Sequence, residues 1–95
     1  MDTVERVLTA VERVPAGGVV TYGDIAELAG TSARRVGSIL KQYGHGLPWW
    51  RVTNARGELP APLLSAARKH WSAEGIALAR SGRGCDLDAH RVSHW

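Results

Sequence analysis

The segment Thr21–Tyr43, with the sequence TYGDIAELAGTSARRVGSILKQY, decides the fold of this chain. A threonine with an aspartate three residues later is typical of a helix start, because its hydroxyl can accept a hydrogen bond from the first turn. Gly30 is suited to end that helix in a left-handed conformation, and Thr31 or Ser32 can cap a second helix at once. Two short helices joined through one glycine predict a helix-turn-helix.

Each of these two helices is predicted to have an apolar face and a polar face. The residues expected to face the core fall at helical spacing: Ile25, Leu28 and Ala29 in the first helix, and Val36, Ile39, Leu40 and Tyr43 in the second. The other face of the second helix is polar and basic: Arg34, Ser38, Lys41 and Gln42. A basic outer face favours DNA binding, although the solvated side of an ordinary helical hairpin has the same pattern.

Weaker signals flank this unit on both sides. Before it, residues 2–5 resemble a helix start, valines follow at helical spacing, and Val19-Val20 is a short extended piece. After it, a proline-rich entry at 60–62 leads into a further helix that ends at Gly75. The predicted fold class is mainly α with short β pieces, a winged-helix-like helix-turn-helix domain. We expect one domain over residues 1–95, with 77–95 as a C-terminal tail packed on it.

Composition excludes several classes of protein. The chain has 95 residues, a net charge of +3 and one cysteine, so it has no internal disulfide and no cysteine-based metal-ligand spacing. No apolar run approaches the roughly 20 residues that span a membrane, and the first residues lack signal-peptide character. We expect a cytoplasmic protein, associated with the nucleoid if bacterial, without cofactor or metal ion. The four histidines show no catalytic-triad spacing.

The segment Leu47-Pro48-Trp49-Trp50-Arg51-Val52 holds two of the four tryptophans side by side. Pro48 disfavours a helix here. Two large aromatic rings followed by an arginine suit a pocket wall that stacks on a flat ligand. The alternative is that one tryptophan packs in the core while its neighbour covers the surface. These residues alone leave both interpretations open.

Taken together, these segments resemble the O6-alkylguanine-DNA alkyltransferases. The matching pieces occur in family order: 19–26 (VVTYGDIA), 33–37 (ARRVG), 47–52 (LPWWRV) and 73–75 (AEG). The resemblance runs from about residue 3 to residue 76, and Cys85-Asp86-Leu87 with Trp95 resembles the family's tail. It covers the family's C-terminal DNA-binding domain and not its N-terminal domain. It implies a helix-turn-helix whose second helix enters the minor groove of double-stranded DNA.

One departure from the family pattern bears directly on activity. Trp49 stands where the alkyltransferases carry the cysteine that accepts the alkyl group, and Trp50 stands where they carry the histidine that activates it. An indole offers no thiolate, so no catalytic residue is expected and the chain is not expected to be an enzyme. Glu74, which orients that histidine in the family, is expected to lack its usual partner. Cys85 is expected to be a small buried filler rather than an alkyl acceptor.

This pattern resembles the alkyltransferase-like proteins, which bind O6-alkylguanine in DNA without repairing it and flag it for nucleotide excision repair. The resemblance implies that the damaged nucleotide is flipped into a tryptophan-lined pocket. The implied partners are double-stranded DNA with alkylated guanine and the damage-recognition proteins of nucleotide excision repair. The alternative is a winged-helix DNA-binding regulator without lesion preference.

The resemblance also assigns roles to single residues. Arg34 matches an arginine that fills the gap left by the flipped nucleotide, Tyr22 matches a tyrosine that contacts the flipped base, and Arg51 is expected to pin the pocket loop. The DNA-binding residues that it implies are Tyr22, Ser32, Ala33, Arg34, Arg35, Gly37 and Ser38. The lesion-pocket residues that it implies are Tyr22, Trp49, Trp50, Arg51, Val52 and Ala61.

Overall fold

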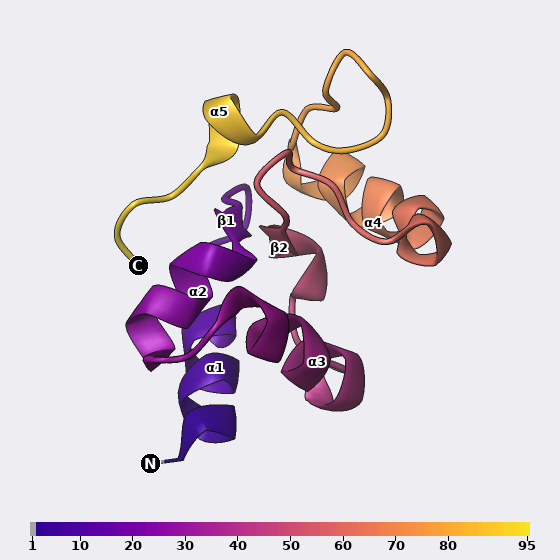
Figure 1. The fold of residues 1–95 in the computed structure, drawn as a ribbon. Helices are drawn as coiled ribbons and strands as arrows, with labels where there is room; N and C mark the ends of the chain where they lie inside the picture. The colour runs from indigo at the N-terminus through magenta and orange to yellow at the C-terminus, as the bar shows by residue number, and fades with distance from the viewer. Residues whose placement is uncertain (1) are drawn as a thin grey trace.

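A computed structural model describes residues 2–95 as a mainly helical domain with a small sheet (Figure 1). Its elements in chain order are α1 (Thr3–Glu12), β1 (Val20–Thr21), α2 (Tyr22–Ala29), α3 (Ala33–Tyr43), the 3-10 turn η1 (Trp49–Arg51), β2 (Val52–Thr53), α4 (Ala61–Glu74) and α5 (Leu87–His90). The predicted fold class is therefore confirmed. None of these helices is both long enough and apolar enough to cross a membrane.

The helix-turn-helix is set by local capping residues. The Thr21 side chain accepts a hydrogen bond from the Asp24 N–H, and the Asp24 carboxylate accepts one from the Thr21 N–H, both at 3.0 Å. Gly30 ends α2 with φ of 72°, in the left-handed region that favours glycine. Ser32 begins α3 by accepting from the Arg35 N–H at 3.1 Å. The short sequence between α2 and α3 thus fixes where one helix ends and the next begins.

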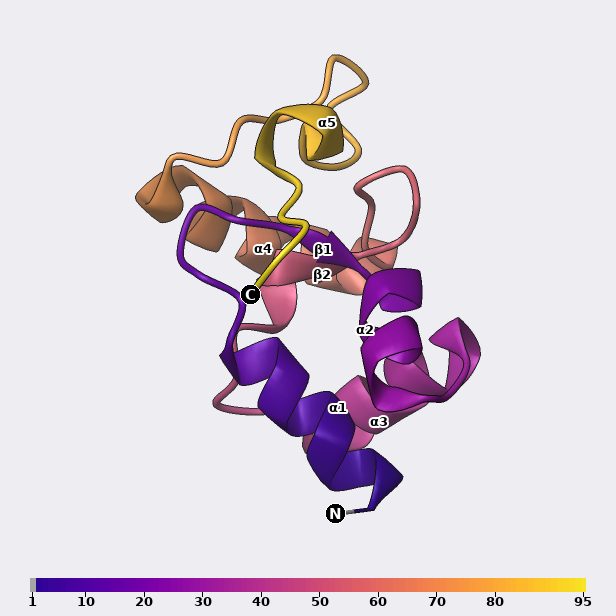
Figure 2. The same ribbon diagram turned by 90° about the vertical axis from the view of Figure 1, so that its left-hand side faces the viewer.

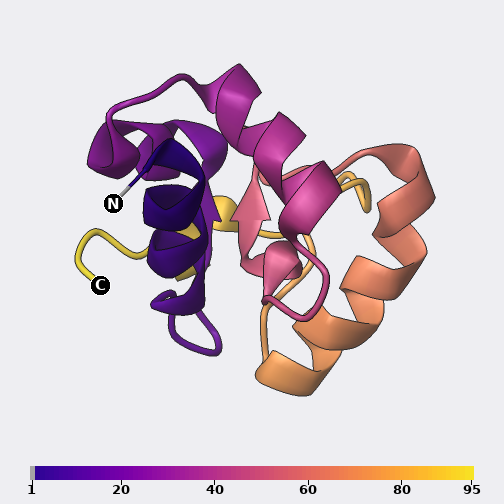
Figure 3. The ribbon, with the colours of Figure 1, turned by 90° about the horizontal axis from the view of Figure 1, so that it is seen from below.

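The parallel strands β1 and β2 lie between two groups of helices. Val20 pairs with Val52, and Thr21 pairs with Thr53. Helices α1, α2 and α3 gather on one side of this pair, and α4 lies on the other (Figures 1 and 3). Each side has its own cluster of buried side chains, and Tyr22 packs against both clusters. Tyr22 therefore lies at the junction of the two halves.

The segment after α4 returns across the body and ends beside α1 and β1 (Figure 2). The Val19 N–H donates to the His90 carbonyl at 3.0 Å, and the Val92 N–H donates to the Val19 carbonyl at 2.9 Å. The Trp95 indole N–H donates to the carbonyl of Ala10 in α1 at 2.8 Å. These contacts tie the C-terminal segment to the half of the molecule that contains the helix-turn-helix.

Two residues predicted to face the core are exposed instead. Leu28 is 60% exposed and Tyr43 is 47% exposed. In α2 the buried stripe is formed by Ile25 and the alanines at 26 and 29, and Leu28 falls to the side of it because successive helical residues are about 100° apart. Tyr43 is the last residue of α3. The buried residues of this helix are Val36 and Ile39, which lie before its last turn.

Candidate nucleic-acid interface

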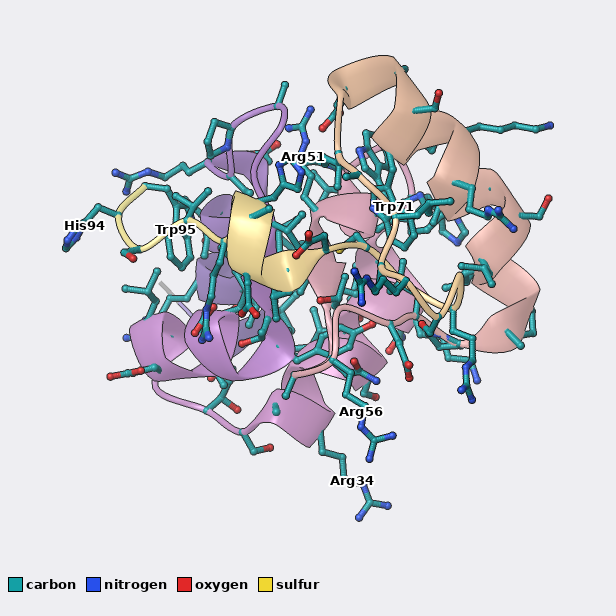
Figure 4. The ribbon with its side chains drawn as sticks, turned by 90° about the horizontal axis from the view of Figure 1, so that it is seen from above. Arg34, Arg51, Arg56, Trp71, His94 and Trp95 are labelled. Atoms are coloured by element: carbon teal, nitrogen blue, oxygen red, sulfur yellow. The ribbon has the colours of Figure 1, made fainter. Side chains whose placement is uncertain are left out.

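The outer face of α3 presents several of the residues predicted to contact DNA. Those that are exposed are Ser32, Ala33, Arg34, Arg35 and Ser38. The side chain of Arg34 extends away from the body, on the same side of the molecule as Arg56 from the loop after β2 (Figure 4). A guanidinium held out in this way is suited to phosphate contact or to stacking within a duplex.

A cavity of about 1070 Å³ adjoins this face. Tyr22 from α2, Ala33, Arg34 and Gly37 from α3, and Trp49 from η1 all line it. A Cβ placed at Gly37 would meet no neighbouring side chain within 4 Å, so internal packing does not require a glycine there. The missing side chain instead leaves room on the cavity wall. Sites for drug-sized molecules measure roughly 300–1,000 Å³, so this space is large enough for a nucleobase.

Four of the residues predicted for the lesion pocket do not line this cavity. They are Trp50, Arg51, Val52 and Ala61. The segment 49–51 forms a 3-10 turn, in which successive side chains point in different directions, so Trp49 and Trp50 cannot share one wall. Val52 is fully buried in β2. Ala61 is exposed at the start of α4, where the prolines on either side of it line the cavity.

Trp50 is held behind the cavity by three contacts. Its ring stacks on His70 of α4, with centroids 3.6 Å apart and ring planes 6° apart. Its indole N–H donates to Oε2 of Glu74 at 2.9 Å, and its carbonyl accepts from the Trp71 indole N–H at 2.7 Å. Glu74 was expected to lack its usual histidine partner, and in the structure it accepts a hydrogen bond from the indole N–H of Trp50 instead. Trp50 is a fixed part of the structure.

Glu74 and Arg51 form an ion pair at the centre of this network. Nη2 of Arg51 lies 2.6 Å from Oε2 of Glu74, and its Nη1 donates to the Val14 carbonyl at 2.9 Å. The Gly17 N–H donates to Glu74 Oε1 at 3.0 Å. Burial by itself raises the pKa of Glu74, but hydrogen bonds from Arg51, Gly17 and Trp50 outweigh it and lower the pKa overall. Glu74 is therefore a carboxylate at the end of α4 that joins the tryptophan segment to the loop after α1.

Trp49 lies between this fixed network and the cavity. Its ring meets the ring of Trp50 edge to face, with centroids 5.7 Å apart and planes 86° apart. It meets the ring of His70 in the same way at 5.8 Å. Trp49 is half-buried and lines the cavity with the rest of its surface. The contacts with Trp50 and His70 fix the orientation of the Trp49 ring, which gives the cavity an aromatic wall.

Tyr22 forms another part of the wall, at the first position of α2. Burial raises the pKa of its hydroxyl above the ordinary value. The phenol is therefore neutral near pH 7 and can donate a hydrogen bond to a base or a phosphate. Its position next to the capping residue Thr21 is fixed by the hydrogen bonds that begin α2.

Cys85 lies away from the cavity, in the buried cluster on the α4 side. Its side chain is 1% exposed, and burial raises the pKa of the thiol to about 11. Almost no thiolate is then present at neutral pH, which is the form that attacks an alkyl group. Among residues 2–95, no group of three or more histidine, cysteine or acidic side chains is placed to hold a metal ion.

Part of the cavity wall was not predicted from the sequence. The further lining residues include Leu40, Lys41, His45, Pro60, Pro62 and Leu63. The helical spacing between Arg34 and Lys41 was a usable signal, because it places both on one face of α3. The residues around the start of α4 gave no such signal, since their place at the cavity depends on how α4 packs against the tryptophan segment.

The helix-turn-helix, the exposed arginine face and the adjoining cavity define a DNA-binding protein. A model of the family described as "6-O-methylguanine DNA methyltransferase, DNA binding domain" matches residues 2–76. The chain therefore belongs to this family, and within it to the alkyltransferase-like proteins, which its relatives and the solved structures below include.

Relatives of this chain support that assignment. The chain is 43% identical over 96 residues to the DNA base-flipping protein of Escherichia coli (strain K12), with 95% of this chain and 74% of that protein covered. It is 33% identical over 87 residues to Alkyltransferase-like protein 1 of Schizosaccharomyces pombe, with 83% and 81% covered. The crystal structure of S. pombe Atl1 with DNA containing O6-carboxymethylguanine superposes with a TM-score of 0.83 at 27% identity, covering 97% of this chain and 95% of that one.

Proposed function

We propose that this protein binds DNA that contains O6-alkylguanine and holds the damaged base, flipped out of the duplex, in the cavity beside α3. The observation that carries the proposal is that Arg34, Tyr22 and Trp49 all line one cavity next to the exposed face of the helix-turn-helix. The relatives named for base flipping and solved with damaged DNA support the same function.

Arg34 and Trp49 would stabilise a flipped nucleotide at two different places. Taking a base out of the stack costs a few kcal/mol, which contacts in the vacated gap of the duplex and contacts to the flipped base can offset. The exposed guanidinium of Arg34 can occupy the vacated position and interact with the neighbouring bases. The aromatic wall of Trp49 can contact the flipped base, since stacking on an aromatic side chain is worth about 1–3 kcal/mol per base.

The proposed function includes no alkyl transfer. Trp49 at the family's acceptor position has no thiol, and the only cysteine is a buried thiol whose pKa is about 11. Trp50 cannot act as a proton-accepting base either, because its indole nitrogen is a donor only and already donates to Glu74. The alkyl group would therefore stay on the DNA.

A protein that leaves the damage in place must pass it on to be useful in repair. We therefore propose that the bound complex flags the lesion for nucleotide excision repair and is recognised by the damage-recognition proteins of that system. We propose for the same reason that the protein is cytoplasmic and, if bacterial, associated with the nucleoid.

Binding to two matched duplexes tests the central proposal. One duplex contains a single O6-methylguanine and the other contains guanine at the same position, at one stated salt concentration because phosphate contacts depend on salt. We expect a preference of roughly tenfold or more for the lesion, about 1.4 kcal/mol. Equal binding to both, with affinity that instead varies among undamaged sequences, would support a winged-helix regulator and reject the proposal.

Mass spectrometry of the protein after incubation with the methylated duplex tests the absence of transfer. We expect the mass of the protein to be unchanged. A gain of one methyl group on Cys85 would show that the buried thiol reacts after all.

A further inference from the structure

The cavity is lined by more residues than those proposed to hold the base, and one of them is a cation. Lys41 lines it from the last turn of α3, and His45 lines it from the loop directly after that helix. Arg34 lines it from the first turn of the same helix. Helix α3 therefore contributes a cationic side chain to the cavity from its first turn and another from its last.

The charge of Lys41 is not neutralised by an ion pair within residues 2–95. The ion pairs there join Arg51 to Glu74 and Arg91 to Asp24. One carboxylate also lines the cavity, that of Glu58, from the loop after β2 rather than from α3. A negative group at the Lys41 end would therefore meet a cationic wall.

Apolar side chains line the same cavity. They are Leu40 of α3 and Pro60, Pro62 and Leu63 at the start of α4. Leu63 is 41% exposed, so part of this apolar surface has no partner within the described part of the chain. A substituent with a short aliphatic stem and an anionic end matches a cavity that combines these apolar residues with Lys41.

We propose that the Lys41–His45 end of the cavity is a subsite for the O6 substituent of the flipped guanine and that it favours substituents ending in a carboxylate. This inference rests on the proposed function, because the guanine ring must lie against Trp49 and Tyr22 for its substituent to reach Lys41. An ammonium and a carboxylate form a charge-assisted hydrogen bond, and walls that exclude part of the water strengthen it.

Four duplexes of one sequence test the subsite, measured with the full chain at one salt concentration. They carry guanine, O6-methylguanine, O6-carboxymethylguanine, or O6-carbamoylmethylguanine, which is the neutral isostere of the carboxymethyl lesion. The carboxymethyl and carbamoylmethyl groups have nearly the same shape, so their ratio isolates the charge. We expect the carboxymethyl duplex to bind roughly fivefold more tightly than the carbamoylmethyl duplex, the upper end for a part-exposed ion pair.

Variants of one lysine assign that preference to a residue. We expect Lys41→Gln to abolish the carboxymethyl-over-carbamoylmethyl ratio while leaving the methyl-over-guanine ratio unchanged. Lys41→Arg keeps the charge and is expected to keep the ratio. Lys69→Gln is the matched control, because Lys69 is exposed on α4 and does not line the cavity.

The outcomes separate this inference from the proposed function. A methyl-over-guanine preference with equal binding of the carboxymethyl and carbamoylmethyl duplexes overturns the subsite alone. A loss in Lys41→Gln that is equal on all four duplexes also overturns it, because it identifies Lys41 as a phosphate contact. Equal binding of all four duplexes by the unchanged protein overturns both.

Discussion

The exposed face of α3 and the network behind Trp50 are each built around an arginine, and they hold it in opposite ways. The side chain of Arg51 is 16% exposed, and its guanidinium donates to Glu74 and to the carbonyl of Val14. Arg34 is exposed, takes no part in the ion pairs of residues 2–95, and extends into solvent (Figure 4). One arginine holds the tryptophan segment in place, and the other is free to meet a ligand.

This difference shows that the role of an arginine depends on whether its N–H groups are bonded within the protein or face the solvent. The donors of Arg51 face α4 and the loop after α1, so this side chain contributes to the site only by fixing the tryptophan segment. The donors of Arg34 face outward beside the cavity, so its interactions are made with a partner. We therefore expect changes at Arg51 to appear in stability and changes at Arg34 to appear in binding.

The largest effect is expected from Arg51→Met, which keeps an aliphatic side chain but removes the cation. Glu74 then retains only the donors of Gly17 and Trp50, and removing one partner of a largely buried ion pair costs about 3 kcal/mol. We expect urea titration to show a loss of this size in the free energy of unfolding. The control is Arg56→Met in the exposed loop after β2, expected to change stability by no more than about 0.5 kcal/mol. Equal losses of stability in Arg51→Met and Arg56→Met would contradict the structural role of Arg51.

A smaller effect, in binding alone, is expected from Arg34→Ala. The substitution removes the group proposed to fill the gap in the duplex, so affinity for the O6-methylguanine duplex should fall roughly tenfold or more, about 1.4 kcal/mol. The free energy of unfolding should change by no more than about 0.5 kcal/mol, since Arg34 is exposed. Arg35→Ala is the neighbouring control, expected to weaken damaged and undamaged duplexes alike. An unchanged lesion-binding curve for Arg34→Ala would reject the role.

The smallest effect is expected at Asp24, whose ion pair with Arg91 is as short as the Arg51–Glu74 pair but more exposed. The N–O distance of this pair is 2.7 Å, and the side chains of Arg91 and Asp24 are 50% and 20% exposed, respectively. Asp24→Asn should cost less than about 1 kcal/mol at pH 7, because exposed pairs contribute little. A cost equal to that of Arg51→Met would show that distance, rather than burial, sets the strength of these pairs.

Lowering the pH should remove the contribution of the Asp24 carboxylate to the free energy of unfolding. Burial raises the pKa of this carboxyl, but hydrogen bonds from Arg91 and Thr21 outweigh it and lower the pKa overall. The stabilisation is therefore present above the ordinary aspartate pKa of about 3.9 and is lost as the pH falls through the lower folded value. Urea titrations at a series of acidic pH values should show a shallower decline for Asp24→Asn than for the unchanged protein.

The helix-turn-helix could be predicted from the sequence because its signals are local. Thr21, Gly30 and Ser32 act on backbone groups within a few residues of themselves, so their effect does not depend on the rest of the fold. The burial of Leu28 and Tyr43 was predicted wrongly, because helical spacing shows which residues share a face but not how far the neighbouring helices extend.

The site could be predicted in part. Tyr22, Arg34 and Trp49 were named from the sequence, and all three line the cavity. Lys41 was named only as part of the basic face of its helix, and Pro60, Pro62 and Leu63 were not named for the pocket, since these residues meet at one cavity only when α4 is packed beside η1.

The sequence by itself determined that residue 49 is a tryptophan and that the one thiol of the chain is that of Cys85, because the functional group of a side chain is a covalent property. It also determined where α2 begins and ends and, to within one residue, where α3 begins. Only the tertiary structure decided that Trp50 turns away from the cavity and donates to Glu74. These two residues are 24 positions apart, and they meet only because α4 packs against the tryptophan segment, which no local pattern records.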